Sequence, residues 1–348
     1  MIRARPAVEA LTPYVAPLEG RRSLLRLDFN ESTLGPSPKV LDAIRGLPPS
    51  AYATYPEYAG LAEAFADSLG VPAATVEAFN GVDAAIRAVF DAYGESGATF
   101  LTTTPTFGYY EPCARQQVMT LDEVPYPDDL AYPTTEIAKR LRAAPRLWFV
   151  CNPNNPTGTV LAPETLLELA ASAPDTLVVV DELYVTFTGV SVLPAALALP
   201  NVITLHSLSK AAGIAALRLG FAIGDPAALD RLRRVTGPYD INMFAVVAGR
   251  AALEDAEHTR RYVAEVAAAK AWTIAELRRL GVRHSTGGGN YMLVWPADCA
   301  RAVAGLREAG ILVRSMAGKP VIDGSFRLTI GTPADMRQFV AALEALLR

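Results

Sequence analysis

Short segments that are apolar at almost every position recur through the middle of the chain, and they limit its fold more than any other sequence feature. Helix-forming stretches, such as residues 163–172, separate several of them. The segments are Ala98–Leu101, Leu147–Cys151, Leu177–Val180, Val202–Leu205 and Leu219–Ile223. A strand that is apolar at every position is buried on both faces, as in parallel sheets covered by helices. The sequence therefore predicts an α/β fold with a mostly parallel sheet between helices.

The last third of the chain has a different character. Residues 244–280 are rich in Ala, Glu and Arg and predict one long helix, either straight or bent, that ends at Gly281. Shorter strands and helices follow it to the C-terminus. We therefore expect a large α/β domain over residues 28–243, and a smaller α+β domain formed by residues 1–27, as an N-terminal arm, and 244–348.

The composition excludes several classes of protein. With 348 residues, 51% hydrophobic and 20% charged, the chain is typical of a soluble globular protein of about two domains. A formal net charge of −4 offers no positive surface for nucleic acid. Three cysteines and three histidines are too scattered for a disulfide framework or a metal site. No segment resembles a signal peptide or a membrane span. We expect a cytoplasmic protein without a metal, nucleic-acid or membrane partner.

Polar motifs follow several apolar segments, at the strand ends where α/β sheets bind ligands. The turn NPNNPTG (residues 152–158) presents an amide side chain held rigidly by prolines and a glycine. Asp181 ends the next segment, where a buried charge needs a cationic partner. Residues 80–83 open a helix whose N-terminal amides suit a phosphate, and residues 105–110 offer an aromatic ring for stacking. These motifs predict a ligand site at one edge of the sheet.

A lysine occupies the most informative of these positions. Lys210 lies between the apolar segment at 202–205 and a Gly/Ala-rich turn, and burial there favours its neutral, nucleophilic amine. Ser207 and Ser209 precede it, and Arg218 follows eight positions later. Two hydroxyls and a guanidinium suit an anion. The pattern predicts a lysine that carries a phosphate-bearing aldehyde cofactor.

The order and spacing of the motifs resemble those of the pyridoxal-phosphate enzymes of fold type I, the aspartate aminotransferase superfamily. The intervals are 26 positions from Asn155 to Asp181 and 29 from Asp181 to Lys210, with Arg218 beyond. Within that superfamily the chain is most similar to the histidinol-phosphate aminotransferases, through LTPY, GPSPKV, YPEY, PYDIN, GILVR and RLTIGT. The resemblance spans nearly the whole chain and implies pyridoxal 5′-phosphate as the cofactor.

The resemblance implies a role for each matching residue. Lys210 would bind the cofactor and move a proton between substrate and cofactor, and Asp181 would pair with the pyridine nitrogen. Asn155 and Tyr184 would hydrogen-bond the ring oxygen, and Phe107 would stack on the ring. The cofactor phosphate would be held by Ser207, Ser209, Arg218 and the backbone of Val82 and Asp83. The catalytic residues implied are Lys210, Asp181 and Tyr184.

The resemblance also implies which residues bind the substrate and how the subunits assemble. The substrate would be bound by Tyr14, Asn155, Arg314 and Arg327. Arg327 would take its carboxylate or phosphate, with assistance from Arg314 and Tyr14. Tyr55 would reach the cofactor phosphate of a neighbouring subunit. The resemblance therefore implies a homodimer with shared active sites.

The activity implied is amino-group transfer from a small-molecule donor to a keto acceptor. The first expectation is transfer between histidinol phosphate and 2-oxoglutarate in histidine biosynthesis. An aromatic amino-acid aminotransferase and a lyase of the threonine-phosphate decarboxylase type stay open as alternatives. A non-catalytic ligand-sensing module is a third, but the presence of both Lys210 and Asp181 argues against it.

Overall fold

The computed structural model describes residues 2–13 and 17–348, and within them a seven-stranded sheet forms the centre of the larger part of the molecule. Its strand order is β2-β8-β7-β6-β5-β3-β4, and β8 alone runs opposite to the other strands. The strands are β2 (Val76–Phe79), β3 (Thr99–Thr104), β4 (Thr120–Pro125), β5 (Leu147–Cys151), β6 (Leu177–Asp181), β7 (Val202–Ser207) and β8 (Gly220–Gly224). The predicted α/β class with a mostly parallel sheet is confirmed.

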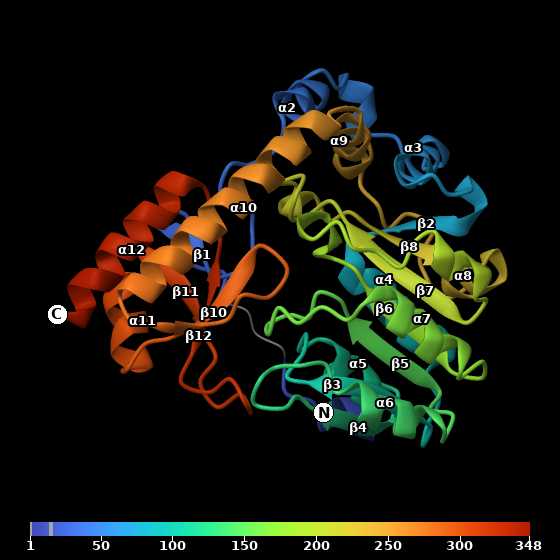
Figure 1. The fold of residues 1–348 in the computed structure, drawn as a ribbon. Helices are drawn as coiled ribbons and strands as arrows, with labels where there is room; N and C mark the ends of the chain where they lie inside the picture. Colours follow the sequence, from blue (N-terminus) through green and yellow to red (C-terminus); the bar gives the residue numbers. More distant parts are fainter. Residues whose placement is uncertain (1, 14–16) are drawn as a thin grey trace.

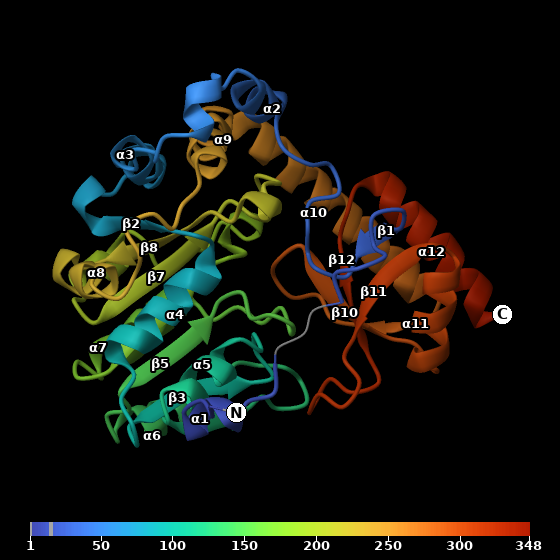
Figure 2. The same ribbon diagram turned by 180° about the vertical axis from the view of Figure 1, so that it is seen from behind.

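Helices cover both faces of this sheet, as Figures 1 and 2 show from opposite sides. Because side chains alternate along a strand, Phe149 packs on one face of β5 while Trp148 and Val150 pack on the other. One face is covered by α4 (Val82–Tyr93), α5 (Tyr110–Gln116) and α8 (Pro226–Arg233). The opposite face is covered by α6 (Thr134–Leu141), α7 (Pro163–Ala171), α3 (Ala59–Leu69) and α9 (Met243–Glu254), and α2 (Pro38–Arg45) packs against α9.

A second sheet lies beside the first and joins segments from both ends of the chain. Its order is β1-β11-β12-β10-β9. Figure 2 shows the blue β1 among the orange and red strands, and Leu25 pairs with Ile311 in parallel register. The strands are β1 (Leu25–Leu27), β9 (Arg283–His284), β10 (Tyr291–Trp295), β11 (Ile311–Ser315) and β12 (Phe326–Thr329). The helices that pack with them are α10 (Ala256–Arg279), α11 (Cys299–Glu308) and α12 (Pro333–Leu347). The short α1 (Pro6–Glu9) packs near α5 of the larger part.

The prediction of one long helix over residues 244–280 is wrong. The backbone leaves the helical conformation at Asp255 (φ −113°, ψ 50°), which separates α9 from α10. The Asp255 carboxylate accepts a hydrogen bond from Ser37, the residue that caps α2. The break lets α9 pack on α2 and α3 while α10 continues across the second sheet. The residue at the break thus makes a contact with a residue 218 positions away along the chain.

The predicted strand at residues 98–101 is displaced and too short, because β3 continues through three threonines to Thr104. Thr102 and Thr103 are buried, and the Thr102 hydroxyl donates to the Phe149 carbonyl of β5 at 3.1 Å. A hydroxyl satisfied in this way can extend a buried strand. Among the residues that the structure describes, no helix is both long and apolar enough to cross a membrane.

Candidate active site

Twelve of the fourteen residues predicted for the site line one cavity of about 620 Å³. They are Val82, Asp83, Phe107, Asn155, Asp181, Tyr184, Ser207, Ser209, Lys210, Arg218, Arg314 and Arg327. The cavity lies at the edge of the large sheet where β5, β6 and β7 end, and the second sheet closes its other side. Tyr55 does not line it, and Tyr14 lies outside the described residues.

The direction of β8 explains why Arg218 belongs to this group. Asp181 and Ser207 end their parallel strands at the carboxyl edge of the sheet. Since β8 runs the other way, the residues before it lie at that same edge. Arg218, two residues before β8, adopts a left-handed backbone (φ 58°) and turns its guanidinium toward α4. The antiparallel strand β8 thus brings the cationic Arg218 beside Asp181 and Ser207, which end parallel strands.

Asp181 is a buried carboxylate with neutral hydrogen-bond partners. Tyr110 donates its hydroxyl to Oδ2 at 2.6 Å, and the Leu183 backbone N–H donates to Oδ1 at 3.1 Å. Burial raises the pKa of Asp181 to about 6, although both hydrogen bonds act in the opposite direction. A carboxylate in this environment would be stabilised by a cationic ligand beside it.

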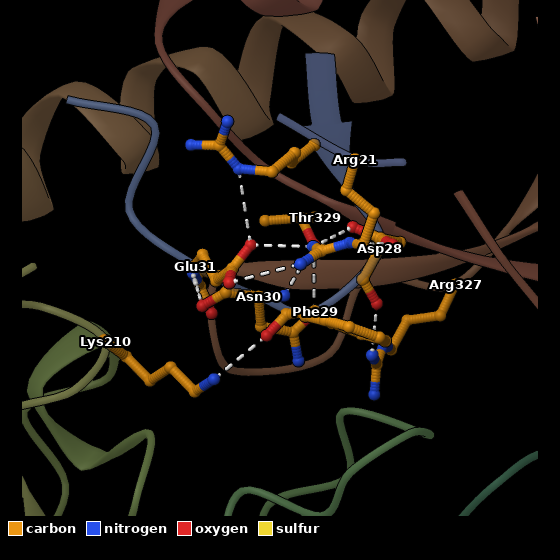
Figure 3. A network of polar contacts seen from close by, with 10 residues as sticks. Arg21, Asp28, Phe29, Asn30, Glu31, Lys210, Arg327 and Thr329 are labelled. Carbon is orange, nitrogen blue, oxygen red and sulfur yellow. Dashed lines mark hydrogen bonds and ion pairs between the residues drawn. The ribbon is translucent and has the colours of Figure 1, made fainter. Parts of the chain in front are cut away.

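Lys210 lines the same cavity as Asp181, and its Nζ donates to the Phe29 carbonyl at 2.9 Å (Figure 3). Burial lowers the pKa of this amine to about 8, and the nearby Arg327 guanidinium lowers it further, whereas Glu31 acts against both. An amine with this pKa is neutral in an appreciable fraction of molecules near neutral pH. Lys210 is therefore suited to act as a nucleophile or as a base.

One end of the cavity is built to hold an anion. The helix α4 begins after Gly81 without a side-chain cap, so Val82 and Asp83 lie in a first turn whose N–H groups no side chain satisfies. Arg218 binds Asp83 at 3.1 Å and contacts Gly81 so closely that an added Cβ would lie 2.7 Å from its Nη2. Ser209 completes this end with its hydroxyl.

Two arginines form the opposite end. Arg314 on β11 lies directly across from Arg327 on β12, and both line the cavity. Arg327 donates to the Asn155 side chain and, at 2.6 Å, to the Asp28 carbonyl. Like charges directly opposite on neighbouring strands destabilise a sheet unless another charge compensates them. The pair is therefore suited to an anionic ligand.

Sequence reasoning missed several residues that the structure brings to the cavity. Phe29 and Glu31 line the cavity on either side of Asn30, and no role was predicted for either of them. Tyr110 lies in the predicted aromatic segment, but its hydrogen bond to Asp181 was not predicted. Lys319 lines the cavity from the loop between β11 and β12, and no local sequence signal marks it.

Tyr55 lies on the surface, with 69% of its side chain exposed. Its ring stacks on that of Tyr239, with centroids 4.1 Å apart and an angle of 22° between the planes. Tyr52, also exposed, packs edge-on against Phe244. The predicted role of Tyr55 concerns a neighbouring subunit and stays a prediction.

Comparison with known proteins shows to which family this chain belongs. The family described as "Aminotransferase class I and II" matches residues 22–343. The chain belongs to this family. This aminotransferase is 36% identical to the histidinol-phosphate aminotransferase of Symbiobacterium thermophilum, over 100% of its own length and 99% of the relative's. The prediction of a pyridoxal-phosphate aminotransferase of fold type I is confirmed.

Two solved structures share the aminotransferase's fold. The histidinol-phosphate aminotransferase of Sinorhizobium meliloti in complex with pyridoxal 5′-phosphate superposes with a TM-score of 0.91 at 25% identity, over 100% of this chain and 98% of that one. The L-threonine-O-3-phosphate decarboxylase of Porphyromonas gingivalis superposes with a TM-score of 0.78 at 24% identity, over 93% and 99%. The second likeness shows the fold alone.

Proposed function

We propose that this aminotransferase moves the amino group of histidinol phosphate to 2-oxoglutarate, with pyridoxal 5′-phosphate as its cofactor. Full-length similarity to histidinol-phosphate aminotransferases supports this substrate. The observation that carries the proposal is the pair of opposed guanidiniums of Arg314 and Arg327. A phosphate dianion fits between two such groups better than a single carboxylate does.

The residues of the cavity fit the cofactor by their donors and charges. The uncapped first turn of α4, with Arg218 and Ser209, suits the cofactor phosphate. At the other side of that space, Asp181 suits a protonated ring nitrogen, because a cation there would relieve the burial of its charge. Lys210 lies in the same cavity with a lowered pKa. Bound pyridoxal phosphate supplies an electron-withdrawing ring and a carbonyl carbon that accepts the amino group.

The protein's own groups then bind, orient and move a proton. Lys210 removes the proton from the α-carbon of the substrate with its Nζ, for which its lowered pKa prepares it. Tyr184 is held by hydrogen bonds from Asn30 at 3.0 Å and from Asn155 at 3.5 Å, so its hydroxyl is fixed at the cavity wall. Phe107 lines the wall where a flat ring would stack.

The amino donor and the acceptor use one site in turn. Glutamate carries a carboxylate on its α-carbon, and histidinol phosphate carries a phosphate ester on the carbon beside the corresponding atom. We propose that Arg327 serves both anions, because it is buried and fixed by Asn155 and by Asp28. Arg314 is less buried and completes the site for the doubly charged phosphate.

The active unit that we propose is a homodimer. Tyr55 and Tyr239 stack on each other at the surface, and neither lines the chain's own cavity. Exposed aromatic clusters of this kind mark protein contacts. In this proposal Tyr55 reaches the cofactor phosphate of the other subunit.

Kinetics on three donors test the substrate. We expect kcat/KM to be highest for histidinol phosphate, lower for phenylalanine, and lowest for threonine phosphate. Arg314→Ala should lower kcat/KM for histidinol phosphate about 30-fold, or about 2 kcal/mol for one lost charge-assisted contact. The loss on phenylalanine should be smaller. The control is Arg307→Ala, at an exposed arginine on α11.

An equal loss on both donors would contradict a dedicated phosphate site. It would favour an aromatic amino-acid aminotransferase, for which the apolar lining of Leu18, Phe29 and Met316 offers a site.

A further inference from the structure

A four-residue segment connects the cationic groups of the cavity to one another. Residues 28–31, called the strap, follow β1 and contact both Lys210 and Arg327 (Figure 3). The Asp28 carbonyl accepts from Arg327 at 2.6 Å, and the Phe29 carbonyl accepts from Lys210 at 2.9 Å. The Asn30 side chain donates to the Tyr184 hydroxyl at 3.0 Å. The position of the strap therefore sets the positions of three groups at the site.

The strap has a backbone that is fixed at its centre. Asn30 has a left-handed conformation (φ 55°), which asparagine tolerates better than most residues. Its N–H donates to the Thr329 hydroxyl at 2.9 Å, and its carbonyl accepts from Asn290 at 3.2 Å. These contacts tie the strap to β12 and to the residue that precedes β10, but they leave its two ends to be held by other groups.

Arg21 holds both ends. Its Nε and Nη2 donate to the two carboxylate oxygens of Asp28 at 2.9 and 2.6 Å, and Nη2 also binds Glu31 at 2.7 Å (Figure 3). Arg21 is only 8% exposed. Burial disfavours its charge, but the hydrogen bonds to Asp28 and Glu31 raise its pKa above the ordinary value. One guanidinium thus bridges the first and last residues of the strap.

The same guanidinium also lies against the aromatic ring of the strap. Its Cζ is 4.0 Å from the centroid of the Phe29 ring, and the Cζ of Arg314 is 5.7 Å from that centroid. Both distances are within the range of cation–π attraction. Phe29 lines the cavity, so its ring links the buried arginine to the arginine of the proposed phosphate site.

We propose that Arg21 is a positioning residue of the aminotransferase. By clamping Asp28 and Glu31 it fixes the strap, and through the strap it places Arg327, Arg314 and the Lys210 amine. The Phe29 carbonyl is available to Lys210 while this amine is not bonded to the cofactor, which is when it acts as a base. This inference rests on the proposed roles of Lys210 and Arg327.

A lysine at position 21 cannot perform this function. Its ammonium carries the same charge, so the carboxylates of Asp28 and Glu31 keep a cation beside them and the protein is expected to fold. It lacks the planar fork that binds two carboxylates at once and stacks on a ring. Arg21→Lys therefore keeps the positive charge at position 21 and removes the planar guanidinium. Arg22→Lys makes the same change at the adjacent, exposed residue and is the matched control.

The test compares these two variants with the wild type as holoenzymes. For Arg21→Lys we expect KM to rise about tenfold for 2-oxoglutarate and for whichever donor the wild type uses best. We expect the melting temperature to change little. Hydrogen exchange followed by mass spectrometry should show faster exchange of the strap amides, about tenfold, with exchange in α12 unchanged. Arg22→Lys should match the wild type in all three measurements.

Two results would overturn the proposal. One is an Arg21→Lys variant with wild-type exchange in the strap and KM values within twofold. The other is a lower melting temperature with unchanged KM, which would make Arg21 a purely structural ion pair. Because the comparison uses the donor that works best, it holds whether or not that donor is histidinol phosphate. Hydrogen exchange, in addition, does not depend on turnover.

Discussion

We expect the Asp181→Asn variant without cofactor to become more stable than the wild type as the pH rises. The same change is expected to weaken cofactor binding. The carboxylate is buried, and its pKa in the folded protein is about 6, against an ordinary value of 3.8. Below pH 3.8 the group is protonated in both folded and unfolded chains. Between pH 3.8 and about 6 the unfolded chain releases the proton while the folded chain retains it, so stability is lost as the pH rises.

The size of this effect follows from the two pKa values. A difference of about two pKa units is worth about 3 kcal/mol, since one unit corresponds to about 1.4 kcal/mol. Asparagine carries no charge and avoids this loss. Its amide cannot accept from both Tyr110 and the Leu183 N–H, which costs about 1–2 kcal/mol at every pH. The variant should therefore be less stable than the wild type near pH 4 and more stable by about 1–2 kcal/mol at pH 7.5.

Urea unfolding of the cofactor-free proteins, followed by circular dichroism at fixed protein concentration, measures this difference between pH 4 and 7.5. Asp128→Asn, at an exposed aspartate, controls for the loss of one carboxylate. In the presence of pyridoxal phosphate the order at pH 7.5 should reverse, because Asp181 then has its cationic partner. A stability difference that is the same at every pH would refute the reasoning.

Two further predictions concern the cofactor and the subunits. Lys210→Ala should abolish turnover and the pH-dependent absorbance band that arises from the bond between Lys210 and the cofactor, yet retain the cofactor through the phosphate end of the cavity; near wild-type transamination rates would exclude Lys210 as the base. A Tyr55→Ala variant mixed with Lys210→Ala under conditions of subunit exchange should regain part of the activity, because one of the two shared sites would be intact. Sedimentation velocity checks that both variants are dimers, and mixtures without any regained activity would contradict the shared site.

The sequence by itself determined the class of the fold and the chemical core of the candidate site. The apolar segments predicted a mostly parallel sheet because strands buried on both faces are apolar at most positions. Asp181 and Lys210 were predicted as site residues because a charge beside an apolar strand is energetically costly unless a partner compensates it, and such residues gather at functional sites. Asn155 was marked by the prolines and glycine around it. Signals of this kind lie within a few residues of one another.

Only the tertiary structure decided which distant groups meet. Arg314 and Arg327 lie opposite each other because of the register of β11 and β12, and Asp255 at the helix break is bonded to the distant Ser37. Arg21 carries no local signal, yet the strap that it clamps reaches Lys210, 181 residues from Phe29 along the chain. Strand register and hydrogen-bond geometry bring such side chains together only after the chain has folded. Local patterns show which residues are chemically unusual, and packing determines which partners they find.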